Sequence, residues 1–329
     1  MTTDIFKNQG HLNPAYDKFK KFVDTSFKLL WTPAKYEKNI EEKDAYEYKH
    51  ILDEKSKSCV KRCILAVSVV EDKVKSYWGD IDKTFPQTII SDLAGLLSFQ
   101  EVVHRISYHS LAKAIGVERD EINNHKVLLD RVKYLSKYLE EDPKVIGRKR
   151  KLKKLVLFTT LVERCSLFTQ FYILMSFSKR VNKLKAISKL QISTATEEAF
   201  HYDFGLALIK TVREESPQLW SDYLQELVNK NIQMAYATEL QIIDWIFEKG
   251  LPEHITKEEI VNVLNYNFKK ISDDLGLGMD YTYDEKIYQE KNAWFFLSTK
   301  SPVTPDFFDD NAGGYSGEKK EINLETFRL

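Results

Sequence analysis

One four-residue motif, Glu-x-x-His, occurs twice in the sequence, at Glu101–His104 and at Glu198–His201. Residues three apart share one face of an α-helix, so each motif places a carboxylate beside an imidazole. The flanking residues are largely apolar, and a carboxylate buried among them is costly unless a partner offsets its charge. A metal ion is such a partner. The repeated motif therefore predicts buried helices whose polar groups face each other around metal.

Two further glutamates lie in apolar helical stretches: Glu71 follows the run 66–70, and Glu163 follows 157–162. Di-iron and di-manganese carboxylate bundles take Glu-x-x-His from two helices and one glutamate from each of two others. Oxygen-rich ligation with one imidazole per ion suits iron or manganese. We therefore predict a dinuclear centre held by Glu71, Glu101, His104, Glu163, Glu198 and His201. The alternative is two unrelated Glu/His pairs on the surface.

The rest of the sequence predicts an all-α fold. Hydrophobic residues make up 43% of the 329 residues, enough for a sizeable core, and 12 Gly and 8 Pro are few for a sandwich or barrel. Gly116 is well placed to end a helix. Apolar periodicity predicts helices at 13–30, 44–77, 87–114, 121–141, 152–178, 181–213, 217–230, 231–248 and 256–274, with a loop at 78–86.

Charge and cysteine content narrow the class of protein. Lys and Arg together number 49, as do Asp and Glu, so the net charge is zero and no nucleic-acid or membrane-surface partner is indicated. No segment is long and apolar enough for a membrane span, and residues 1–28 show no secretory signal. Three cysteines, Cys59, Cys63 and Cys165, are interpreted as reduced thiols of a cytoplasmic protein.

The composition changes near residue 299. Proline, aspartate and glycine dominate up to 317, which predicts a tail at 299–329 after one helical domain at 1–298. The last seven residues regain three apolar side chains, Leu324, Phe327 and Leu329. They are either a partner-docking peptide or a frayed terminus.

Tyr108 lies one helical turn beyond His104, on the same helix face. A tyrosine at that place could be oxidised to a radical by an adjacent metal pair. It could equally be a core aromatic residue with a hydrogen-bonded hydroxyl, and its position alone does not decide between the two.

Three motifs, at 98–108, 162–168 and 196–201, together with Trp31-Thr32-Pro33 and the last seven residues, resemble the small (beta) subunit of class I ribonucleotide reductase. The resemblance covers most of the chain, from 27 to 329. It implies a ferritin-like helical bundle with a dinuclear metal site in its core. It also implies that Glu71, Glu101 and His104 hold the first metal and that Glu163, Glu198 and His201 hold the second.

The same resemblance implies how the subunit works. Tyr108 occupies the radical-tyrosine position, and Trp31 is the conduit tryptophan, linked through His104 and the acidic Glu197. Tyr315 would relay the oxidising equivalent to the large (alpha) subunit, which reduces ribonucleoside diphosphates and which this chain's last residues would contact. The family forms homodimers.

The sequence departs from many family members at three places. Glu71 and Glu197 stand where many members have aspartate, and Tyr315 lies close to the end of the chain. The first difference recurs in manganese-using subgroups, in one of which the oxidising equivalent stays on the metals. The cofactor could therefore be two manganese ions, two iron ions or a mixed Mn/Fe pair.

Three other classes compete with this interpretation. The first is a ferritin-like dimetal oxidase that acts on its own substrate and needs no docking tail or conduit tryptophan. The second is a metal-storage or peroxide-detoxifying protein, which predicts a shorter chain or a four-cysteine site that three cysteines cannot supply. The third is a helical interaction protein that binds no metal.

Overall fold

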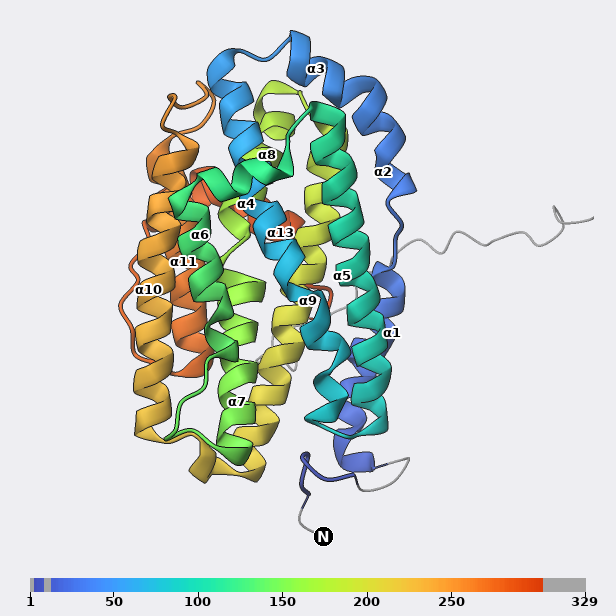
Figure 1. Cartoon of the computed structure of the whole chain (residues 1–329), viewed down its shortest axis with the longest axis vertical. Coiled ribbons are helices and arrows are strands. Elements are labelled where there is room, and N and C mark those ends of the chain that lie inside the picture. The colour runs from blue at the N-terminus through green and yellow to red at the C-terminus, as the bar shows by residue number, and fades with distance from the viewer. Residues whose placement is uncertain (1–2, 9–12, 304–329) are drawn as a thin grey trace, which may run out of the picture.

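A computed structural model describes residues 3–8 and 13–303 of the chain, with the backbone alone for 72–76 and 119–120. Every regular element in those ranges is helical, which confirms the all-α prediction (Figure 1). The α-helices are α1 (Lys20–Leu29), α2 (Ala34–Asn39), α3 (Ala45–His50), α4 (Glu54–Gly79), α5 (Thr88–Ile115), α6 (Lys126–Leu135), α7 (Gly147–Leu157), α8 (Phe168–Val181), α9 (Lys185–Glu215), α10 (Asp222–Ile246), α11 (Lys257–Leu275), α12 (Glu285–Ile287) and α13 (Ala293–Ser298).

Shorter helical turns of other types connect these helices. Five are 3₁₀ turns: η1 (Pro14–Phe19), η3 (Ile81–Lys83), η4 (Arg119–Asn124), η5 (Ser136–Leu139) and η7 (Pro217–Leu219). Three are π-helical: η2 (Ile40–Asp44), η6 (Phe158–Cys165) and η8 (Tyr288–Asn292). The segment η6 is long for a π-helix, and such helices are frequent at functional sites.

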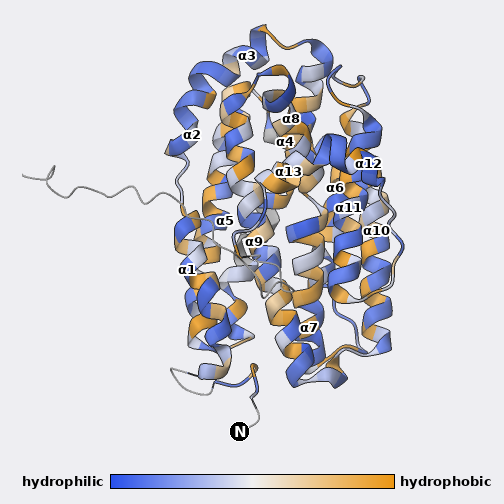
Figure 2. Cartoon of the chain, turned by 180° about the vertical axis from the view of Figure 1, so that it is seen from behind, coloured by the Kyte–Doolittle hydropathy of each residue, from blue (hydrophilic) through white to orange (hydrophobic). Residues whose placement is uncertain are grey.

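The long helices run along the long axis of the molecule, and their apolar residues pack into one core (Figures 1 and 2). Side-chain caps explain where several of them begin. Asp53 accepts a hydrogen bond from the Ser56 N–H at the start of α4, and Thr256 forms a capping box with Glu259 at the start of α11. Gly116 ends α5 in the left-handed conformation, as its sequence position predicts.

The predicted helix boundaries are wrong at several places. The helix expected at 44–77 is interrupted at 51–53, because the Asp53 cap starts a new helix. The helix expected at 152–178 is divided into α7, η6 and α8, and 121–141 is divided into η4, α6 and η5. The helix expected from 181 starts at 185, after Asn182 and Leu184 adopt positive φ.

The two helices expected at 217–230 and 231–248 are one continuous helix, α10. Asn231 lies inside α10, and its side-chain amide donates to the Leu227 carbonyl one turn earlier in the same helix. The asparagine therefore bonds within α10 and does not interrupt it. Trp78 was expected in a loop, but it lies in the last turn of α4 and is fully buried.

A buried ion pair ties together four helices outside the Glu/His motifs. The Arg131 guanidinium on α6 donates at 2.9 Å and 2.5 Å to the carboxylate of Glu239 on α10. It also donates to the Ala66 carbonyl on α4 at 2.7 Å and to Gln170 Oε1 on α8 at 3.1 Å. The Tyr134 hydroxyl donates to Glu239 as well. Each charged atom of the pair thus has a partner, as buried charges require.

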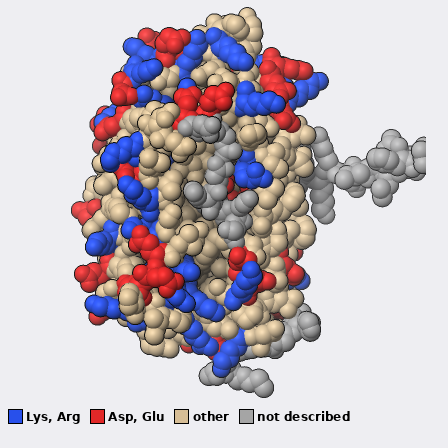
Figure 3. Space-filling model, viewed as in Figure 1, with Lys and Arg blue, Asp and Glu red and all other residues tan. Residues whose placement is uncertain are grey.

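On the face shown in Figure 3, positive and negative side chains are interspersed over the surface. No helix within the described ranges is long and apolar enough to cross a membrane.

Candidate metal centre

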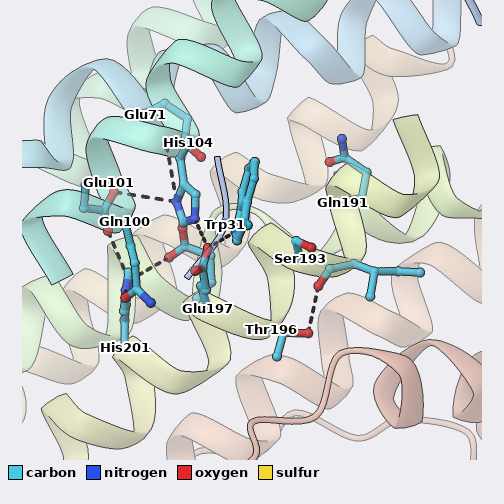
Figure 4. Close-up of polar contacts among 12 residues, drawn as sticks. Trp31, Glu71, Gln100, Glu101, His104, Gln191, Ser193, Thr196, Glu197 and His201 are labelled. Atoms are coloured by element: carbon cyan, nitrogen blue, oxygen red, sulfur yellow. Dashed lines mark hydrogen bonds and ion pairs between the residues drawn. The ribbon is translucent and has the colours of Figure 1, made fainter. Parts of the chain in front are cut away.

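The six residues predicted as metal ligands converge in the middle of the bundle. Glu71 comes from α4, Glu101 and His104 from α5, Glu163 from η6, and Glu198 and His201 from α9. None of these six residues is more than 2% exposed. Helical spacing places each histidine one turn after its glutamate, and Figure 4 shows Glu71, Glu101, His104 and His201 directed toward one another.

Two of these side chains, Glu101 and Glu198, connect the two groups of candidate ligands. One group is Glu71, Glu101 and His104, and the other is Glu101, Glu163, Glu198 and His201; within each group the ligand atoms lie within 4.8 Å of one another. Glu101 thus belongs to both groups. Glu198 links the two imidazoles, with Oε1 3.1 Å from His104 Nδ1 and Oε2 3.7 Å from His201 Nδ1.

The donor set fits a pair of cations. Both carboxylate oxygens of Glu71 and of Glu101 are buried without a hydrogen-bond partner among the described residues. Glu71 lies 3.9 Å from His104 Nδ1, and Glu101 lies 3.1 Å from His201 Nδ1. Four buried carboxylates exceed what two imidazoles can neutralise, and two divalent cations would balance all four.

Burial raises the pKa of the Glu71 and Glu163 carboxyls well above the ordinary range, and raises that of Glu101. Glu198 differs: burial raises its pKa, but hydrogen bonds from His104 and His201 bring it below the usual value. The cluster therefore binds protons in competition with cations, and a cation that enters must displace them.

Glu197, which belongs to neither group of candidate ligands, links Trp31 to His104 by hydrogen bonds. Glu197 Oε2 accepts from Trp31 Nε1 at 2.7 Å and lies 2.7 Å from His104 Nε2 (Figure 4). A carboxylate only accepts, so Nε2 of His104 donates to Glu197, and Nδ1, which faces Glu198, is the atom that would bind a metal once its proton is displaced. The Trp31 and His104 rings stack with centroids 6.1 Å apart.

The sequence did not predict two contacts made to the group that contains Glu163 and His201. Gln100 Oε1 lies 3.0 Å from His201 Nε2, so it orients that imidazole as Glu197 orients His104. The Trp78 indole donates to Glu163 Oε1 at 2.9 Å. The available signal for Trp78 was its place two helical turns after Glu71, on the same face of α4.

Tyr108 is buried on α5, and its hydroxyl donates to Gln191 Oε1 at 2.7 Å. Burial and the nearby carboxylate of Glu71 raise the pKa of Tyr108 well above its ordinary value, so the phenol stays protonated. Leu167 and Phe171, which follow Glu163 along the chain, are both buried.

The remaining predicted site residues belong to the tail. Tyr315, Leu324, Phe327 and Leu329 lie outside the described residues, as does most of the predicted tail at 299–329.

Fold and site together define a class: a ferritin-like helical bundle whose core holds a carboxylate–histidine cluster suited to two metal ions. Within this class, the family model described as "Ribonucleotide reductase, small chain" matches residues 11–292. The chain therefore belongs to the small-chain family of ribonucleotide reductase.

Individual relatives are distant in sequence. The beta subunit of ribonucleoside-diphosphate reductase from Chlamydia pneumoniae is 23% identical over 167 residues, which are 47% of this chain and 47% of that protein. The match thus spans about half the length of this curated relative.

Solved structures share the fold. The ribonucleotide reductase R2 subunit of Clostridium botulinum superposes with a TM-score of 0.73 at 18% identity, covering 91% of this chain and 99% of that one. A variant of an R2-like ligand-binding oxidase with a Mn/Fe cofactor superposes with a TM-score of 0.62 at 13% identity, covering 82% and 96%.

Proposed function

We propose that this chain is the radical-generating small subunit of a ribonucleoside-diphosphate reductase. It would store a one-electron oxidising equivalent and pass it to a large subunit, which reduces ribonucleotides to deoxyribonucleotides. The observation that carries the proposal is the hydrogen-bonded path Trp31–Glu197–His104, which leads from a candidate metal ligand to an indole outside the cluster. A protein that only stores metal has no use for such a path.

In this proposal Glu71, Glu101 and His104 hold one ion, and Glu163, Glu198 and His201 hold the other. The shared position of Glu101 suits a carboxylate that contacts both ions. The metal pair, when bound, supplies the one-electron oxidant. The protein supplies fixed ligand positions and a dry core, because every candidate ligand is buried and water is kept from a strong oxidant.

The proposed roles of Trp31 and Tyr108 follow from their hydrogen bonds. Glu197 holds the Trp31 indole and the His104 imidazole on one oxygen, so it couples their positions and accepts from both. Tyr108 is the proposed storage site when the oxidising equivalent leaves the metals, and Gln191 Oε1 accepts a hydrogen bond from its hydroxyl. In a manganese form the equivalent would stay on the metals and Tyr108 would remain a neutral phenol.

The proposed partners are the large subunit and a second copy of this chain, in the cytoplasm. Leu324, Phe327 and Leu329 would dock on the large subunit, with Tyr315 as the relay. The helices α1 and α5 lie against each other, and each carries exposed apolar side chains, Phe27 on α1 and Phe99 and Ile106 on α5. These side chains support a homodimer that forms through α1 and α5.

Reconstitution tests the proposal. The chain alone should reduce no ribonucleotide, and adding it to a matching large subunit should restore reduction. A variant lacking 324–329 should lose that restoration while its metal content is unchanged. Metal analysis with low-temperature EPR, after loading with manganese, iron or both, identifies the cofactor. A sharp tyrosyl signal with stoichiometric iron would exclude the manganese form.

The second candidate is a dimetal oxidase that acts on its own substrate. Its support is the fold shared with R2-like ligand-binding oxidases. Substrate turnover by the loaded chain without any large subunit would favour it and would contradict the reductase proposal.

A further inference from the structure

Glu163 is the one candidate ligand carried by a π-helix. A π-helical turn is wider than an α-helical turn and is rarely stable without support from its surroundings. The two Glu-x-x-His motifs lie on regular α-helices, where the backbone itself sets the positions of glutamate and histidine. The position of Glu163 therefore depends on contacts from outside its own segment.

The first of these contacts orients the carboxylate. Trp78 Nε1 donates to Glu163 Oε1 at 2.9 Å, while Glu163 Oε2 lies 3.3 Å from His201 Nδ1. The indole is itself held by packing, because its ring contacts Phe158 edge-on at 5.4 Å and Phe204 at 5.5 Å between centroids. One carboxylate oxygen is thus engaged, and the other faces the histidine of its own group.

The second contact sets the distance between η6 and α9. Gly205 lies one turn after His201 on α9, and Thr159 lies four residues before Glu163 on η6. A Cβ atom at Gly205 would lie 2.2 Å from Thr159 Oγ1, 2.5 Å from Cγ2 and 2.9 Å from Cβ. Rotating the threonine cannot relieve this overlap, since Thr159 Cβ is itself too close. A larger residue at 205 must therefore push the two helices apart.

We propose that Trp78 and Gly205 are positioning residues that set the place of the Glu163 carboxylate for the second metal ion. Trp78 sets the direction of the Glu163 carboxylate. Gly205, on α9, sets how closely η6, which carries Glu163, approaches His201. This inference rests on the proposed dimetal centre. It assigns the two residues to one half of that centre, since neither contact involves Glu71 or His104.

The test is a titration of metal-free protein with Mn(II), in which EPR of free Mn(II) gives two stepwise affinities. Trp78→Phe keeps most of the ring packing and removes the N–H donor; Gly205→Ala adds the missing Cβ. Each should weaken one of the two binding steps by about 10- to 100-fold, the usual cost of losing a group that supports a ligand. The other step should be unchanged.

Two matched controls separate positioning from general effects. Trp294→Phe removes another indole hydrogen bond, to the Lys291 carbonyl, far along the chain. Gly95→Ala adds a Cβ to a helical glycine that has nothing within 4 Å. Both controls should bind two ions as the unmodified chain does, and far-UV circular dichroism should show equal helix content in all variants that are compared.

The outcomes are distinct. If the unmodified chain binds no ion pair, the proposed function fails. If it binds two ions and Trp78→Phe binds both with unchanged affinity, the positioning inference is overturned. Equal weakening of both steps also overturns it, because that result indicates a general structural defect. Should Gly205→Ala not fold, Trp78→Phe still decides the matter.

Discussion

Replacing Glu71 or Glu101 by alanine should have unequal effects on metal content. Glu71 belongs to one candidate ligand group, whereas Glu101 belongs to both. Glu71→Ala leaves the second group complete and should retain about half of the metal of the unmodified chain. Glu101→Ala removes a carboxylate from each group and should retain much less. The other four candidate ligands, His104, Glu163, Glu198 and His201, are present in both variants.

The size of the effect follows from the distances in the cluster. The Nδ1 atom of His104 lies 3.9 Å from the carboxylates of Glu71 and Glu101. One unit charge at about 4 Å, with an effective dielectric constant of about 20, is worth about 4 kcal/mol. This corresponds to about a thousandfold in affinity. A loss of that size is easily resolved in a binding titration.

Metal analysis after desalting, together with EPR of bound and free Mn(II), measures both stoichiometry and affinity. Glu253→Ala, at an exposed position, is the control and should bind as the unmodified chain does. The reasoning is refuted if Glu71→Ala and Glu101→Ala retain equal amounts of metal while both remain folded. A greater loss in Glu71→Ala would show that the shared carboxylate is a different one.

Three further changes test other parts of the structure. Trp31→Phe removes the indole donor to Glu197, so ribonucleotide reduction with a large subunit should stop while metal analysis shows an unchanged content. Burial, helped by the nearby Arg180 charge, lowers the pKa of His254 to about 4 from 6.5. Its stabilising contribution is complete above about pH 6.5 and is lost as the pH falls toward 4. In urea unfolding at pH 7 and pH 5, the unmodified chain should therefore lose more stability than His254→Gln, by about 1–2 kcal/mol once solvent screening of this partly exposed group is allowed for. Arg131→Met leaves a buried charge unpaired and should cost about 3–5 kcal/mol in urea unfolding, and the double variant with Glu239→Gln should cost less; equal costs would contradict the ion-pair account.

The candidate ligands could be predicted because helical spacing is local. Glu-x-x-His places its two side chains one turn apart on any helix, so the pairs at 101–104 and 198–201 follow from sequence alone. Apolar flanks then indicated that both pairs are buried. The sharing of Glu101 between two groups could not be predicted, because it depends on how closely four helices approach one another.

The irregular parts of the fold were not predictable for a related reason. Residues 158–165 are all buried although half of them are polar, so the pattern of polar and apolar residues does not follow solvent exposure and cannot distinguish a π-helix from an α-helix. Trp78 was assigned to a loop because Gly79 and Asp80 follow it directly. Its burial comes from contacts with η6 and α9, which are remote in sequence.

The unpaired carboxylates at the centre of the bundle also bear on how long the protein survives. A cation that binds the folded chain and not the unfolded one raises stability in proportion to the logarithm of its free concentration. Because the centre lies where α4, α5, η6 and α9 meet, that stabilisation acts on the whole core. Scarcity of the ion would then lower the amount of intact protein, by favouring unfolding and proteolysis, as well as the fraction that is catalytically competent.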